Sequence, residues 1–128
     1  MTRNHKTLDI FIESNQLLDE VYAWADRLPA EEKFGLQSQL RRAALSVPTN
    51  LVEGCNRRTD SDTAHFVFIA LASAAEVQYL LDFAKKRYFT AEARAIEQLI
   101  AAYASIVRRA QAYGQWLERQ ALRGRPRP

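Results

Sequence analysis

Apolar residues recur at helical spacing along four long stretches of this chain, a pattern that favours an all-α fold. The 128 residues include only four glycines and four prolines, which leaves little material for the turns of a β-rich fold. Short turns between the helices make consecutive helices antiparallel. The sequence therefore predicts an up-down-up-down four-helix bundle over residues 1–122 and a disordered basic tail over 123–128. We expect the helices at residues 8–28, 29–54, 60–87 and 90–122.

The first and last stretches each carry an apolar seam of the kind that faces a bundle core. The seam of the first stretch comprises Phe11, Ser14, Leu18, Val21, Ala25 and Leu28. A second stripe beside it consists of Ile10, Leu17 and Trp24. The core stripe expected for the last helix comprises Ile96, Ile100, Tyr103, Val107, Ala110, Gly114 and Leu117.

The second stretch contains a proline, Pro48, within an otherwise helical pattern. An interior proline removes one backbone donor and clashes with the carbonyl of the preceding turn, here that of Ala44, at a cost of about 3 kcal/mol. We therefore predict a kinked second helix. The polar residues around the kink are the first place to look for function, and they are Ser46, Thr49, Asn50 and Glu53.

The second and third helices carry more apolar surface than one bundle face requires. One face of the second helix holds Leu36, Leu40, Ala43, Val47 and Leu51, and another holds Phe34, Leu45, Pro48 and Val52. The third helix is apolar almost all round. This excess predicts an interface between subunits, and the alternative is a tightly packed monomer with a few exposed aliphatic residues.

Several polar residues of these two helices are candidates for structural or interface roles. A polar strip on the second helix includes Arg42, Asn50, Glu53 and Arg57, and Glu53 and Arg57 are spaced to pair. Arg41 and Arg58 complete the two arginine pairs of this stretch. Glu76 falls in a stripe of the third helix that we expect to face the core. A buried carboxylate needs a partner, and the candidates are Arg41 and Tyr103. The alternative is a role in ligand binding or gating.

Basic residues are concentrated at the C-terminal end of the chain. Residues 108–128 contain six arginines and one glutamate, a net charge of +5, whereas the preceding 107 residues carry 12 basic and 14 acidic residues, a net charge of −2. Arginines with an interleaved aromatic residue can neutralise phosphates and stack a base. The alternative is a solubilising surface with one amphipathic tryptophan. The candidate nucleic-acid-binding residues are Arg108, Arg109, Trp116, Arg119 and Arg123.

The sequence lacks the residue patterns that metal binding, phosphate binding and triad catalysis require. The two histidines, His5 and His65, do not have the spacing of a metal site, and the chain has neither a phosphate-binding glycine loop nor a catalytic triad pattern. We expect no enzymatic activity, no metal and no cofactor. The single cysteine, Cys55, excludes an intrachain disulfide and fits a cytoplasmic location. The N-terminus has no apolar segment of a signal peptide, and no apolar run is long enough to predict a membrane span.

The stretch GLQSQLRRAALSVPTNLVEGCNRR resembles the four-helix-bundle family first noticed as proteins encoded in intervening sequences of bacterial 23S ribosomal RNA genes. The likeness extends into the third helix at Phe66, residues 69–73, Glu76 and Leu80, and covers about residues 8–122. Cys55 and Asn56 stand where a more glycine-rich turn is usual, and the RGRPRP tail is particular to this chain.

The resemblance implies a ring-shaped homopentamer of four-helix bundles. It also implies kinship with the accessory protein of diversity-generating retroelements, which binds a reverse transcriptase and nucleic acid through a basic surface. The sequence therefore predicts a non-enzymatic, oligomeric bundle that binds RNA or DNA as an accessory module, with a reverse transcriptase or another protein as a further partner. The alternative is a protein-binding scaffold that does not contact nucleic acid.

Overall fold

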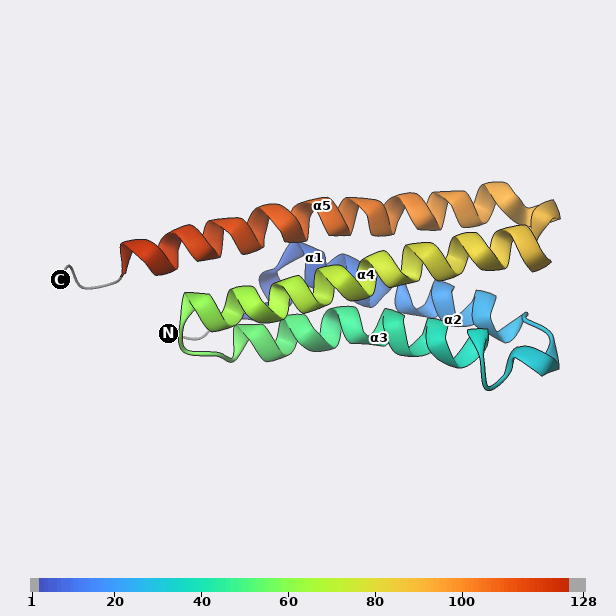
Figure 1. The fold of residues 1–128 in the computed structure, drawn as a ribbon, viewed down its shortest axis with the longest axis horizontal. Helices are drawn as coiled ribbons and strands as arrows, with labels where there is room; N and C mark the ends of the chain where they lie inside the picture. The colour runs from blue at the N-terminus through green and yellow to red at the C-terminus, as the bar shows by residue number, and fades with distance from the viewer. Residues whose placement is uncertain (1–2, 125–128) are drawn as a thin grey trace.

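Five α-helices and three single-turn 3-10 helices make up residues 3–124, the part of the chain that this computed structural model describes (Figure 1). The α-helices are α1 (Asp9–Gln16), α2 (Leu18–Asp26), α3 (Leu36–Cys55), α4 (Asp60–Tyr88) and α5 (Ala93–Arg123). The 3-10 helices are η1 (His5–Thr7), η2 (Ala30–Glu32) and η3 (Thr90–Glu92). Apart from Arg123 and Gly124, the predicted basic tail lies outside the described residues.

The helices form the expected all-α, antiparallel four-helix arrangement, in which α1 and α2 together supply the first helix. α4 lies between α3 and α5, and α1 contacts both α3 and α5 on the other side (Figure 1). The α3–α4 turn is capped by Thr59, whose hydroxyl accepts a hydrogen bond from the Asp62 backbone N–H at 3.1 Å. Seven of the eight helix ends fall within three residues of those predicted, and the exception is the start of the second helix.

The bend of the bundle lies in the first helix, not at Pro48 in the second. The first helix bends by 26°, at the junction between α1 and α2. The buried Ser14 lies just before the junction, and its hydroxyl donates to the Phe11 carbonyl at 3.1 Å, a local bond that often bends a helix. α3 instead continues through the buried Pro48 to Cys55. The predicted kink of the second helix was therefore placed in the wrong element.

The second helix also begins later than predicted. Residues 30–32 form a separate 3-10 turn after Pro29, and α3 starts only at Leu36, with Gly35 as its N-cap. Gly35 has φ −112° and ψ −107°, which is not a helical conformation, so the chain changes direction there. Phe34 consequently lies in a turn, where its side chain is 90% exposed.

The core follows the predicted seams with two additions. Val21, Ala25 and Leu28 of the first seam are buried, as are Ile96, Tyr103 and Leu117 of the last. Leu99 and Ile106 of α5 are buried as well, because α5 packs against α4 and α1 at once and needs a wider apolar stripe than a single seam.

α4 is a long helix with a continuous apolar stretch. By length and composition alone it could span a membrane, since its mean hydropathy reaches 1.5 over 18 residues. In this fold it packs against α3 and α5, which is the usual position of a core helix.

Candidate nucleic-acid interface

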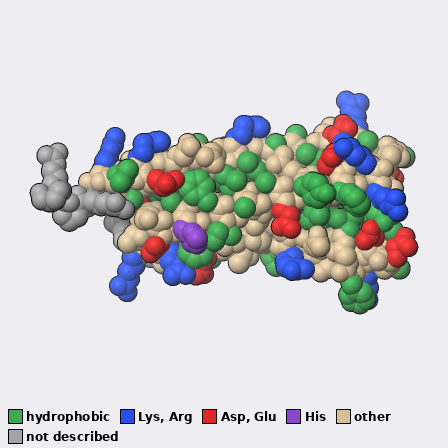
Figure 2. Space-filling view, viewed as in Figure 1, with side chains coloured by type: hydrophobic (Ala, Val, Ile, Leu, Met, Phe, Trp, Pro, Cys, Tyr) green, Lys and Arg blue, Asp and Glu red, His purple; other side chains and the backbone are tan. Residues whose placement is uncertain are grey.

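Four arginines form a stripe on the outer surface of α5, and we call them the α5 arginine stripe: Arg94, Arg108, Arg119 and Arg123. All four are exposed, and at 100° per residue they lie opposite the buried stripe of this helix. Figure 2 shows basic side chains along the upper edge of the molecule, where α5 runs in Figure 1. Within residues 3–124, none of the four forms an ion pair with a carboxylate.

Arg109, although adjacent in sequence, does not belong to this stripe. Its guanidinium pairs with Glu13 and, at 3.3 Å, with Asp9 of α1, and its Nε donates to Ser105 Oγ at 3.1 Å. Partial burial opposes the charged form, but the hydrogen bonds to both carboxylates outweigh it and raise the pKa of Arg109 above its usual value. Its charge is thus paired in a partly exposed contact that connects α5 to α1. We therefore remove it from the predicted phosphate-binding residues.

Trp116 lies beside the stripe near the end of α5. Its side chain is 44% exposed, and its ring stacks on that of Tyr113, with centroids 6.2 Å apart and planes inclined by only 16°. Sequence analysis identified Trp116 but missed Tyr113. The spacing of three residues, which places side chains next to each other on a helix, was the available signal.

The arginines predicted to have structural roles differ in their contacts. Arg57 pairs with Glu53 at 2.6 Å, as their spacing predicted, and it also lies 4.7 Å over the ring of Phe66. Arg41 pairs with Asp26 of α2, not with Glu76. Arg58 is exposed after the end of α3. Arg41 thus connects α3 to α2, and Arg57 contacts α4 through Phe66, so both residues stabilise the fold.

Asn50, another of the predicted residues, bonds within α3. Its amide donates to the carbonyl and the hydroxyl of Ser46 at 2.8 and 2.9 Å. The Ser46 hydroxyl in turn bonds Ser73 of α4 at 2.8 Å. The Ser46–Ser73 bond therefore joins α3 to α4, and Ser46 and Asn50 lie two residues before and after Pro48.

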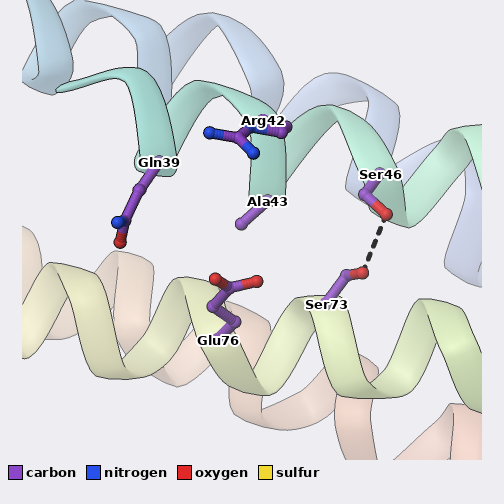
Figure 3. Close-up of a pocket in the computed structure, with 6 residues that line it drawn as sticks. All are labelled: Gln39, Arg42, Ala43, Ser46, Ser73 and Glu76. Atoms are coloured by element: carbon purple, nitrogen blue, oxygen red, sulfur yellow. Dashed lines mark hydrogen bonds between the residues drawn. The ribbon is translucent and has the colours of Figure 1, made fainter. Parts of the chain in front are cut away.

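A polar groove of about 290 Å³ lies on the surface between α3 and α4 (Figure 3). It is lined by Gln39, Arg42, Ala43, Ser46, Ser73 and Glu76. Figure 3 shows the Glu76 carboxylate pointing from α4 toward α3 across this groove. The groove has no ordering of groups typical of catalysis, and within the described residues neither Arg42 nor Glu76 forms an ion pair.

Glu76 is exposed in the chain, so the prediction that it is buried in the core was wrong. It bonds neither Arg41 nor Tyr103, and the Tyr103 hydroxyl is buried without a partner among the described residues. α4 is apolar on nearly every side, so its pattern did not identify the core-facing stripe. The buried residues, including Val77, Leu81 and Ala84, lie about 100° around the helix from the predicted stripe.

Large apolar side chains remain exposed on both sides of this groove. Phe34 and Leu45 lie on the α3 side, and Tyr79 and Phe83 lie on the α4 side. Figure 2 shows apolar side chains spread over the face formed by α3 and α4. The predicted apolar excess of these helices is therefore present on the surface of the chain.

Comparison with protein families finds a match for most of the chain. The family model described as 23S rRNA-intervening sequence protein matches residues 6–112, which is most of the chain. A comparison with curated proteins gives no significant match. The matched span includes Arg94, Arg108 and the groove, and it ends before Trp116, Arg119 and Arg123.

Proposed function

The chain belongs to the 23S rRNA-intervening sequence protein family, and we propose that it acts as a non-enzymatic, oligomeric nucleic-acid-binding module of the cytoplasm. The observation that carries this proposal is the α5 arginine stripe. Its four guanidinium groups are exposed and have no carboxylate partner within residues 3–124, so their charge is available to a polyanion.

The stripe extends along most of α5. At 1.5 Å per residue, Arg94 and Arg108 are about 21 Å apart along the helix, and Arg119 and Arg123 are about 6 Å apart. Guanidinium groups bind phosphate oxygens in a bidentate way, and each phosphate that is neutralised releases counterions. Binding of this kind depends on the backbone and little on base sequence, so it should fall steeply as salt rises.

Oligomerisation is the second part of the proposal. Exposed Phe34, Leu45, Tyr79 and Phe83 support a subunit interface on the α3–α4 face, where a second copy would remove them from water. We propose a closed homo-oligomer, a pentamer as the family resemblance implies. Because α5 contacts α4 and α1 but not α3, its outer surface would stay free, and the assembly would repeat the stripe in every subunit.

The experiment is fluorescence anisotropy with labelled RNA and DNA between low and physiological salt. The test variant carries Arg108→Glu and Arg119→Glu. The control carries Lys6→Glu and Arg58→Glu, which changes the net charge equally at exposed positions outside the stripe. We expect the wild type and the control to bind and the test variant to lose binding. If the wild type binds neither nucleic acid at low salt, the proposal is wrong.

A protein-binding scaffold is the second candidate function. The exposed apolar side chains that support a subunit interface would equally support contact with another protein, and a reverse transcriptase is the partner that kinship with the retroelement accessory protein implies. If the folded wild-type protein binds neither RNA nor DNA in the anisotropy experiment, that result would favour this candidate.

A further inference from the structure

We propose that Trp116 is a stacking platform for unpaired bases, so that the ligand of the α5 surface is single-stranded nucleic acid. This inference rests on the proposed function and specifies its ligand. Arginines alone would bind any polyanion, whereas an exposed aromatic ring adds a contact that only an accessible base face can make.

The indole is held in place from one side. Tyr113, half-buried against the hydrophobic core, lies nearly parallel to it with ring centroids 6.2 Å apart. Parallel rings at this centroid distance are offset, so Tyr113 supports the indole at one side, and Trp116 is still 44% exposed. A large ring that is supported at one side and otherwise open is preorganised to stack a base.

The other tryptophan shows what a structural indole looks like in this chain. Trp24 packs against Phe89, with the two ring centroids 5.1 Å apart, and the guanidinium of Arg27 lies 4.5 Å from the centroid of the Trp24 ring. Trp24 is thus engaged by an aromatic ring and a cation from its own chain. Among the described residues, Tyr113 supplies the one aromatic ring paired with Trp116, and no cation lies over the indole.

Phosphate-binding groups lie beside the platform. Arg119 is three residues after Trp116 and Arg123 is seven, so both fall on the same side of α5. The carboxylate of Glu118 is about 200° around the helix from Trp116 and does not interrupt this side. A strand could therefore place a base on the indole while its phosphates contact the two guanidinium groups.

The bundle leaves this part of α5 accessible. α1 meets α5 at Arg109, and Trp116 lies seven residues, about 10 Å, further toward the C-terminus. Beyond it, the last turns of α5 extend past the turn that joins α3 and α4 (Figure 1). No helix among residues 3–124 covers Trp116 to the extent that the core residues of α5 are covered. A duplex keeps its bases stacked inside the helix and can meet this surface only through phosphates.

The test uses Trp24→Phe protein, in which Trp116 is the only tryptophan. Single-stranded RNA and DNA of about 16 nucleotides and the corresponding duplexes serve as probes. Both single strands should quench Trp116 fluorescence, because stacking and phosphate contacts do not require the ribose hydroxyl. The duplexes should bind more weakly without quenching. Trp116→Ala should weaken single-strand binding by about fivefold or more, leave duplex binding unchanged and leave the salt slope unchanged, whereas Trp116→Tyr should restore much of the loss.

The outcomes separate the two proposals. If the single strand and the duplex bind equally, without quenching, and still depend on the arginine stripe, the stacking platform is refuted and the proposed function stands. If the Trp24→Phe protein and the wild type bind no probe at low salt, both are refuted. The quenching measurement needs no change at Trp116, so it decides the matter even if Trp116→Ala does not fold.

Discussion

Arg109 of α5 pairs with Glu13 of α1, across 96 positions of sequence, and a second bond at 3.3 Å connects it to Asp9. This contact joins the first and last helices of the bundle. The neighbouring Arg108 is exposed and forms no ion pair within residues 3–124. Two adjacent arginines thus have separate roles, one in the fold and one on the candidate nucleic-acid surface.

We expect Arg109→Ala to lower the free energy of unfolding by about 1 kcal/mol, a value at the upper end for partly exposed ion pairs because two carboxylates lose their partner. Arg108→Ala should change stability by less than about 0.5 kcal/mol and weaken nucleic-acid binding instead. Urea unfolding and anisotropy of the two variants measure both effects. Equal stability of the two variants would contradict the role assigned to Arg109.

Introducing a charge at Leu45 should dissociate the proposed oligomer. Leu45 is 47% exposed on α3, and Leu45→Asp would place an unpaired carboxylate within the subunit interface. Ile12→Asp is the matched control, because Ile12 is 41% exposed on α1, away from the α3–α4 face. Light scattering should give a single-chain mass of 14.7 kDa for the Leu45 variant and the oligomer mass for the control. A monodisperse wild type of 14.7 kDa would instead exclude the oligomer.

Gly54 is required for the close approach of α3 and α4. A Cβ at this position would lie 2.9 Å from Phe66 Cβ and 3.2 Å from the Thr63 carbonyl oxygen, neither of which can rotate away. The overpacking cost of about 1–3 kcal/mol should exceed the gain of about 1 kcal/mol in helix propensity, so we expect Gly54→Ala to destabilise. Gly124→Ala, whose Cβ would have its nearest contact at 3.6 Å, is the control. Thermal melts of the two variants test this, and a stabilised Gly54 variant would contradict it.

Tyr103 should make the protein sensitive to alkaline pH. Burial raises the pKa of its phenol well above the usual value of about 10, so above that pH the unfolded chain loses a proton that the folded chain keeps. Stability contributed by this group is therefore complete below about pH 10 and is lost as pH rises toward the folded-state pKa, by at most about 1.4 kcal/mol per pH unit.

Unfolding of Tyr103→Phe measured between neutral and alkaline pH checks this prediction. The variant should lack this slope, and it should be at least as stable as the wild type at neutral pH because the hydroxyl has no partner among the described residues. Tyr79→Phe, at an exposed ring, controls for the loss of a tyrosine hydroxyl. If the wild type and Tyr103→Phe have the same alkaline slope, the phenol does not control it.

The sequence was sufficient to locate the helices and much of the core. Seven-residue spacing identified Val21, Ala25, Ile96 and Tyr103 as core residues, because a helix that packs along one seam repeats its contacts at that period. The pair between Glu53 and Arg57 was also predictable, because four residues along a helix bring side chains together whatever the rest of the fold does.

Tertiary packing alone decided which side of α4 faces the core and which of the two adjacent arginines of α5 is paired. An almost uniformly apolar helix has no polar face to mark its outside, so only its neighbours α3 and α5 determine that Val77 is buried and Glu76 is exposed. Likewise, Arg108 and Arg109 are consecutive residues of the same type, and the sequence around them does not show that they have different roles. Successive residues of a helix are rotated by 100°, so the two side chains have different surroundings. The fold brings Glu13 of α1 beside Arg109 and pairs its charge, whereas Arg108 is exposed to solvent.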